Sequence, residues 1–138
     1  MTTRAALVAI SILAWACGSD ISSPVDCRDG LVVRFRHAFD RTQPFGLHLD
    51  ADFGILSCTL DPELGPTHEC TEQGVHLEFS GDAISGFFLA GRHPSRISVV
   101  VTTNVGETLR STLTPQYSTV EPNGAGREPR CRSAVEEL

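Results

Sequence analysis

The sequence contains no lysine, so all 11 of its basic side chains are arginines. Against them stand 17 aspartates and glutamates, which give the 138-residue chain a formal net charge of −6. No run of basic residues appears along the sequence, which argues against binding to nucleic acid and against adhesion to anionic lipid surfaces. An acidic balance of this size favours solubility and indicates no particular ligand.

The sequence also lacks the short motifs of common enzymes. It has no Gly-x-Ser-x-Gly turn, no His-Glu-x-x-His motif and no glycine-rich phosphate loop. Ser80-Gly81-Asp82 is typical of a turn, and Ser85-Gly86 is typical of a bulge in a strand. We therefore predict no catalytic residues and no cofactor, and we expect that the protein is not an enzyme.

No hydrophobic run is long enough to span a bilayer comfortably, which takes about 20 residues. The longest run, residues 5–16, follows Arg4 at the start of the chain. A short cationic start, about a dozen apolar residues and a small-residue cleavage site together indicate an export signal. We predict a lipoprotein-type signal peptide over residues 1–16, a flexible tether over 17–26 and one domain over 27–138.

A cysteine, Cys17, directly follows the predicted signal segment, which ends Leu13-Ala14-Trp15-Ala16. This run resembles the lipobox of bacterial lipoproteins, in which the cysteine receives diacylglycerol before cleavage. The resemblance implies lipid on Cys17 and a place in the bacterial cell envelope, at the outer membrane and facing the periplasm or the cell surface. Ala14-Trp15-Ala16 also fits cleavage of a soluble secreted protein, and an uncleaved N-terminal anchor is the third alternative.

Four cysteines remain in the predicted domain: Cys27, Cys58, Cys70 and Cys131. An even number in a small exported domain indicates two disulfides, for which three pairings exist. We favour Cys58–Cys70, which closes a short loop, and therefore Cys27–Cys131. Loop entropy predicts a stabilisation of about 3 kcal/mol for the short loop and about 4 to 5 kcal/mol for the long one. The alternative is a metal site formed by Cys58, His68 and Cys70, although zinc sites usually have tighter spacings.

Beyond the leader, apolar residues alternate with polar ones, which is the pattern of half-buried strands. The strands that we expect cover residues 31–36, 45–50, 55–60, 75–80, 83–90, 97–102, 107–113, 116–120 and 132–138. Many short strands separated by turn residues predict an all-β fold, a single antiparallel β-sandwich of about seven to nine strands. A small barrel is the alternative. We expect strand 97–102 to be central and strand 132–138 to be an edge or a frayed end.

Several motifs of the carboxyl-terminal half occur in a recognisable order: Ile84-Ser85-Gly86, Pro94, the strand 97–101, the turn 104–106, Pro115-Gln116-Tyr117, Pro122-Asn123-Gly124 and Cys131. This order resembles small bacterial lipoproteins of unknown function with a transthyretin-like or carboxypeptidase-regulatory-type β-sandwich. In that pattern a second cysteine follows the Pro-Asn-Gly turn, where this chain has Arg127 or a neighbour. The resemblance implies a fold and a location, and it implies no activity.

His48, Asp50 and Asp52 alternate along the chain and share one face if the strand stays extended. Carboxylates in this arrangement at a loop can hold Ca²⁺, which takes six to eight oxygen ligands. No third carboxylate lies nearby in the sequence. The other interpretation, which we favour, is a solvated hairpin in which Asp50 and Asp52 cap the turn.

Two further polar groups invite a binding interpretation. His76 and Glu78, with His68, Glu69 and Glu72 just before them, can form a surface site for a transition metal or simply a polar strand face. Arg34 and Arg36, followed by His37 and Arg41, can clamp an anion or pair with carboxylates across strands. The plainer interpretation is favoured for both, so we predict no metal site.

The sequence thus favours an exported, lipid-anchored domain with a non-catalytic binding or structural role. Its expected partners are the membrane, through lipid on Cys17, and an unknown protein or envelope ligand, with no nucleic acid. The alternative is a small secreted enzyme or metal-binding protein that uses His48, Asp50 and Asp52, or His68, His76 and Glu78.

Overall fold

The computed structural model describes residues 27–66, 70 and 72–138. The predicted signal peptide and tether, with Cys17, lie outside the described residues. The described chain forms β1 (Gly30–Asp40), β2 (Phe45–Ala51), β3 (Gly54–Asp61), β4 (Gly65–Pro66), β5 (Val75–Ser80), β6 (Ala83–Ala90), β7 (Ile97–Thr103), β8 (Gly106–Leu113), β9 (Ser118–Val120) and β10 (Cys131–Glu137). The all-β prediction is confirmed, but β1 continues to Asp40, beyond the expected end at residue 36, and β4 was not predicted.

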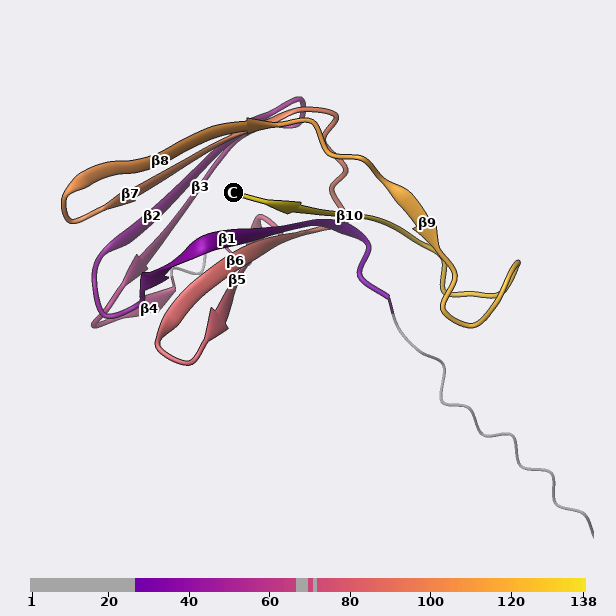
Figure 1. The fold of residues 1–138 in the computed structure, drawn as a ribbon, viewed down its shortest axis with the longest axis horizontal. Helices are drawn as coiled ribbons and strands as arrows, with labels where there is room; N and C mark the ends of the chain where they lie inside the picture. Colours follow the sequence, from indigo (N-terminus) through magenta and orange to yellow (C-terminus); the bar gives the residue numbers. More distant parts are fainter. Residues whose placement is uncertain (1–26, 67–69, 71) are drawn as a thin grey trace, which may run out of the picture.

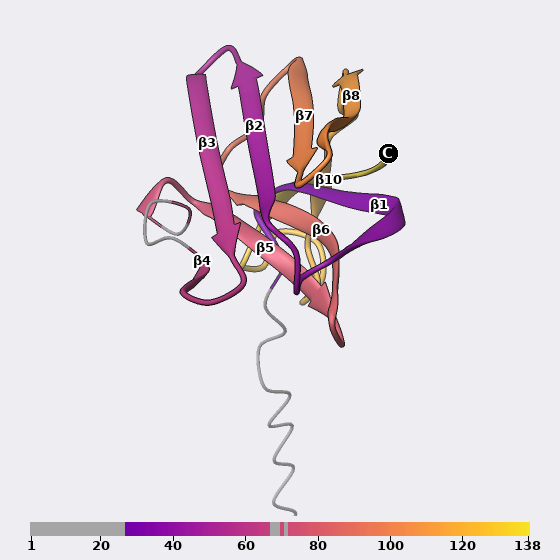
Figure 2. The same ribbon diagram turned by 90° about the vertical axis from the view of Figure 1, so that its left-hand side faces the viewer.

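The strands form two sheets of five. The first sheet has the order β5-β6-β1-β10-β9, and the second has the order β4-β3-β2-β7-β8. Figure 1 shows the two sheets as separate layers, and Figure 2 shows that the strands of the second sheet run across those of the first. The predicted β-sandwich is therefore confirmed, and β7 has the predicted central place between β2 and β8.

The core lies between the sheets and is built from alternate residues of the strands. In β2, Phe45, Leu47 and Leu49 are buried, whereas His48 and Asp50 are exposed on the other face. Burial of these side chains favours folding by about 25 cal/mol for each Å² of apolar surface removed from water. The other fully enclosed side chains include Leu31, Val33, Val75, Ile84, Phe87, Leu89, Ile97, Val99 and Val101.

The last strand differs from the prediction in place and direction. β10 lies between β1 and β9 and pairs with β1 in parallel, from Gly30 opposite Ser133 to Arg34 opposite Glu137. The pairing continues at Leu138, whose N–H donates to the Arg34 carbonyl at 2.9 Å. The glutamates suggested an edge, but alternation places Ala134 in the core, where it is 3% exposed, and leaves Glu137 in solvent.

Both favoured disulfides are present. Cys27–Cys131 joins the segment before β1 to the first residue of β10, and Cys58–Cys70 joins β3 to the segment before β5. The first bond spans 104 residues and fixes the register in which the first and last strands lie side by side. A metal site formed by Cys58 and Cys70 is wrong, because their sulfur atoms are bonded to each other.

Gly86 lies at the predicted bulge. The pairing of β5 with β6 shifts between Glu78 and Phe79, so that Ser85 is an extra residue on β6. A Cβ at Gly86 would lie 2.1 Å from the carbonyl oxygen of Val33. Since that oxygen belongs to the backbone of β1, only glycine allows the two strands to approach this closely.

We expect Gly86→Ala to lower the free energy of unfolding by about 3 kcal/mol, because a strand must move to relieve the contact. Gly46→Ala is the matched control. Its Cβ would lie 2.5 Å from Thr102 Oγ1, a side-chain atom that can rotate away. The control should change the free energy by less than about 0.5 kcal/mol. Urea unfolding of both variants measures this, and equal losses would contradict the packing role of Gly86.

Candidate functional site

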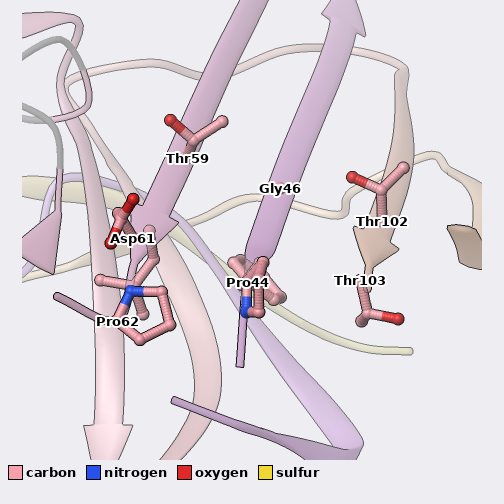
Figure 3. A pocket seen from close by; sticks show the side chains of 9 residues that line it. Pro44, Gly46, Thr59, Asp61, Pro62, Thr102 and Thr103 are labelled. Atoms are coloured by element: carbon pink, nitrogen blue, oxygen red, sulfur yellow. The ribbon is translucent and has the colours of Figure 1, made fainter. Parts of the chain in front are cut away.

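An open groove lies on the outer face of the second sheet, above Gly46 of β2. Gly46 pairs with Thr59 of β3 on one side and with Thr102 of β7 on the other. Because glycine has no side chain, the two threonines flank an empty strip, and the resulting groove has a volume of about 300 Å³. We call it the Gly46 groove; Figure 3 shows Thr59 and Thr102 on either side of it.

The Gly46 groove has a mixed polar and apolar lining that carries no positive charge. Its lining residues are Pro44, Phe45, Gly46, Thr59, Leu60, Asp61, Pro62, Thr102 and Thr103. Asp61 Oδ1 accepts hydrogen bonds from the N–H groups of Glu63 at 2.8 Å and Leu64 at 3.3 Å, which fixes the carboxylate beside the groove. Hydroxyls and one carboxylate suit a neutral or cationic polar group, and they repel an anion.

A second polar cluster lies at the other end of the sandwich, where Cys27 and Cys131 are joined. His93 Nε2 lies 3.2 Å from Asp29 Oδ1 and 3.0 Å from the carbonyl oxygen of Arg132. The Arg132 N–H donates to the same Asp29 oxygen at 2.8 Å. This hydrogen bond, helped by His93, lowers the pKa of Asp29. We call this region the Cys27 end; its hydrogen bonds join β1, β10 and the β6–β7 connection.

Tyr117 packs against this cluster. Its hydroxyl donates to the carbonyl oxygen of Pro94 at 3.0 Å, and the Arg132 guanidinium lies over its ring, 5.0 Å from the centroid. Burial raises the pKa of Tyr117 to about 12, and the negative charges of Asp52 and Glu136 add to this, whereas Arg132 opposes it. The phenol is therefore protonated at neutral pH and serves as a structural donor.

A shallow hollow of about 380 Å³ adjoins His93 and is also lined by Asp52, Phe53 and Arg92. Asp52 Oδ2 accepts from the N–H and the hydroxyl of Ser95, at 3.3 and 3.2 Å. The Arg92 guanidinium lies over the Phe53 ring, 4.7 Å from its centroid. These contacts join the β2–β3 turn to the β6–β7 connection, so the polar groups around the hollow hold the end of the sandwich together.

The candidate calcium ligands do not converge. His48 and Asp50 lie on the outer face of β2, where His48 Nδ1 is 2.9 Å from Ser57 Oγ, whereas Asp52 is turned toward Ser95. Within residues 27–66, 70 and 72–138, no three histidine, cysteine, aspartate or glutamate side chains are grouped so that they can hold a metal ion. β2 and β3 form the expected hairpin, but Asp52 accepts hydrogen bonds from Ser95 of the β6–β7 connection instead of capping the turn.

His76 and Glu78 share the outer face of β5 as predicted, but each has another partner. His76 stacks on Phe88, with ring centroids 6.1 Å apart, and Glu78 forms an ion pair with Arg28. Glu72 is exposed, and His68 and Glu69 lie outside the described residues. Within the described residues, His76 and Glu78 therefore form a polar strand face.

The arginines of β1 point outward, as the alternation predicts. Arg34 and Arg36 are both exposed, and Arg36 Nε lies 3.9 Å from a carboxylate oxygen of Glu137 on β10. Arg41 lies over the ring of Phe79. Cross-strand pairing thus accounts for Arg36.

Neither the Gly46 groove nor the cluster at the Cys27 end follows from a local pattern of the sequence. Asp29 and His93 are 64 residues apart, and Asp29 and Arg132 are 103 residues apart, so no local spacing connects them. Gly46 lies in an otherwise regular alternation. The only available signal was a glycine at an outward position of a strand, which marks a place where a neighbour or a ligand approaches closely.

Comparison of the chain with protein-family models, curated proteins and solved structures finds no match. The part of the chain that the structure describes contains no helix long and apolar enough to cross a membrane.

Tyr117 is the only tyrosine of the chain, so the near-ultraviolet absorbance of tyrosinate reports on it alone. We expect a titration midpoint near pH 12 in the folded protein, where burial raises the pKa, and near 10 after unfolding in urea. The raised pKa contributes stability that is present below about pH 10 and is lost as pH rises through the folded value. Tyr117→Phe should not show this loss of stability at high pH. Equal titration midpoints in the folded and the unfolded protein would contradict the prediction.

The ionised carboxylate of Asp29 should stabilise the folded protein at neutral pH, and this contribution should be lost in acid. Its pKa is lowered in the folded state, so its contribution is present above the unfolded pKa and is lost as pH falls through the folded one. We expect Asp29→Ala to lower the free energy of unfolding by about 1 kcal/mol at neutral pH, because the carboxylate is nearly half exposed. Asp50→Ala, which removes an exposed carboxylate of β2, is the control. Urea unfolding at neutral and acid pH should show the difference shrinking on acidification for Asp29 alone.

Proposed function

We propose that this protein is an exported, lipid-anchored β-sandwich of the bacterial cell envelope with a non-catalytic binding or structural role. The observation that carries the proposal is that Cys27, where the predicted tether joins the domain, and the Gly46 groove lie at opposite ends of the sandwich. The predicted tether joins the domain at Cys27, and the Gly46 groove lies at the opposite end of the second sheet. In Figure 1 the start of β1 lies on the right, and β4 and the β7–β8 turn lie on the left.

Chain connectivity supports this separation. Gly46 is near the start of β2, whereas Ala51, at its end, pairs with Ile97, directly after the β6–β7 connection that contacts Asp29. Ten residues lead from Cys17 to Cys27 and span at most about 35 Å when fully extended. Lipid on Cys17 would therefore keep Cys27 within about 35 Å of the bilayer, and the Gly46 groove lies at the end of the domain farther from this point of attachment.

The disulfides support an oxidising compartment, which agrees with export. Both bonds close segments of the folded domain, and such bonds persist outside the cytoplasm. The resemblance to small bacterial lipoproteins points to the same location, with the outer membrane as the site of attachment. A soluble secreted form is the alternative, and it differs only in that Cys17 carries no lipid.

The Gly46 groove is the surface on which we place binding. It is open and shallow, and it presents hydroxyls and the fixed Asp61 carboxylate to a polar ligand from the envelope. At the Cys27 end, by contrast, His93 and Tyr117 use polar atoms to join strands and loops. An enzyme or a metal-binding protein remains the second hypothesis, and no contact among the described residues favours it over a binding role.

Mass spectrometry of the protein purified from bacterial membranes tests the anchor. We expect the chain to begin at Cys17, with a diacylglycerol adduct on that residue and with the other four cysteines oxidised. Cys17→Ser should shift the protein from the membrane fraction to the soluble fraction. An N-terminus at Cys17 without lipid would leave the export signal in place and overturn the anchor.

A panel of hydrolase substrates and elemental analysis of the same purified protein test the non-catalytic role. We expect no turnover and no stoichiometric metal. Turnover that is lost in His93→Ala but kept in the matched surface variant His48→Ala would overturn the role and move the working site to the Cys27 end.

A further inference from the structure

Of the four strands at the sheet edges of the described chain, β5 alone has no structural barrier to pairing with another strand. β5 and β9 are the edges of the first sheet, and β4 and β8 are those of the second (Figure 1). β9 has three residues, β4 has two and includes Pro66, and β8 carries Thr108 as an extra residue. Short edges, proline and bulges are means by which proteins prevent edge-to-edge pairing. β5 has six residues and no proline, and the extra residue of its bulge, Ser85, lies on β6.

The backbone of β5 presents hydrogen-bonding groups on the side away from β6. In an antiparallel pair, residues that bond to the neighbouring strand alternate with residues whose N–H and C=O point the other way. The Ala90 N–H donates to the Gly74 carbonyl at 2.9 Å, and the Ser85 hydroxyl donates to the Glu78 carbonyl at 3.2 Å. Even-numbered residues of β5 therefore bond to β6. The residues with outward groups are Val75, Leu77 and Phe79.

The side chains of β5 form an apolar face and a polar face. Val75 is buried in the core, Leu77 packs against it, and Phe79 continues this face with a ring that is 38% exposed. His76 and Glu78 lie on the opposite, outer face. β5 therefore offers a neighbouring strand apolar side chains on one face and, on the other, a histidine and a carboxylate two residues apart.

We propose that two copies of this chain pair through β5, antiparallel about a twofold axis at Leu77, and join their five-stranded sheets into one. In this register Val75 lies opposite the partner's Phe79, and Leu77 lies opposite its own counterpart. On the outer face His76 lies opposite the partner's Glu78, and the axis repeats this pair. The proposal goes beyond the proposed function, because it requires neither lipid on Cys17 nor a ligand in the Gly46 groove.

Charge complementarity selects this register. Both strands must direct their backbone groups toward each other, so β5 can shift against its copy only in steps of two residues. A shift in one direction places His76 opposite itself, and a shift in the other places Glu78 opposite itself. Like charges directly opposite each other are unfavourable, whereas a histidine can donate a hydrogen bond to a carboxylate whether the ring is charged or neutral. The register centred on Leu77 is the one that joins these two groups.

The present contacts of His76 and Glu78 are compatible with a second partner. His76 stacks on Phe88, which engages the face of the imidazole and leaves its nitrogens at the ring edge. Glu78 forms an ion pair with Arg28, and a carboxylate has about four lone-pair sites for donors. The partner's histidine can therefore join the existing ion pair without replacing Arg28.

The pairing surface is small, so we expect a weak dimer. Six residues on each side bury less than the roughly 1,200 Å² at which stable interfaces begin. We expect a dissociation constant between about 1 µM and 1 mM. Copies that are tethered to one membrane would meet at a higher effective concentration than copies in solution.

Sedimentation equilibrium over a series of concentrations tests the dimer. The chain from residue 18 onward keeps every described strand and both disulfides, and it omits Cys17. We expect an equilibrium between monomer and dimer only, because a twofold pairing uses the β5 edge of both copies. A monomer at about 1 mM, or growth into larger species, would refute the proposal.

Two matched glutamate substitutions test whether β5 is the contact. Glu78→Gln removes the charge from both cross-strand pairs and should raise the dissociation constant about fivefold. Glu107→Gln is the control, since Glu107 also lies on an edge strand and pairs with an arginine, Arg110, at 2.7 Å. The control should change the constant less than about twofold. Equal changes in the two variants would exclude β5 as the contact, and urea unfolding checks that both variants remain folded.

Disulfide cross-linking tests the register. Opposite residues of a non-hydrogen-bonded antiparallel pair have Cα atoms about 4.5 Å apart, which a disulfide can span. A mixture of the His76→Cys and Glu78→Cys chains should therefore form a linked dimer on mild oxidation, and each variant alone should form far less. A mixture of Glu107→Cys and Arg110→Cys on β8 is the matched control and should not link. Equal linking of either β5 variant with itself would show a different register, and no linking in the β5 mixture would refute the pairing.

Discussion

The parallel pairing of the first and last strands is the constraint on which the remaining structure depends. β1 lies between β6 and β10, so it contributes hydrogen bonds to both of its neighbours and three buried side chains, Leu31, Val33 and Phe35, to the core. A parallel pair cannot be closed by a tight turn, so the whole domain is the connection between its two strands. The bond between Cys27 and Cys131 offsets the entropy of that long closure, which loop arithmetic puts at about 4.7 kcal/mol for a loop of 100 residues.

The two ends of the sandwich use polar residues in different ways. At the Cys27 end, Asp29 and His93 connect elements that are distant in the sequence, and Tyr117 closes the packing around them. Beside the Gly46 groove, the hydroxyls of the flanking threonines lie on an open strand face. Polar groups therefore connect distant segments at the Cys27 end, whereas at the Gly46 groove they lie on an open strand face.

Local patterns predicted most of the fold. Alternation placed Leu47 inside and His48 outside, and Gly86 marked the bulge, because these features depend on the pleat of one strand and its immediate neighbour. The cysteine pairing also followed, since a short loop between Cys58 and Cys70 left one remaining choice. The direction of β10 did not follow, because its glutamates carry no information about which strand lies beside it.

The sites were also harder to predict, because they too depend on which strands lie side by side. Of the candidates chosen by spacing, His48 and Asp50 lie on β2, whereas Asp52 lies in the following turn and accepts hydrogen bonds from Ser95. The contacts that the structure does form, Asp29 with His93 and Arg132, join residues at the starts of strands and in connections. Such contacts depend on topology, and a single sequence without a recognised motif does not specify topology.

The arrangement of β1 also has a mechanical consequence. If a ligand held in the Gly46 groove pulls against the anchor, the force enters the domain at Cys27 and runs along β1 toward the opposite end. The hydrogen bonds that join β1 to β6 and β10 lie across this direction and are loaded together as a shear, so they must break at once rather than in sequence. The disulfide divides the same load between β1 and β10. A pull of this kind would therefore load β1 in shear along both of its hydrogen-bonded edges.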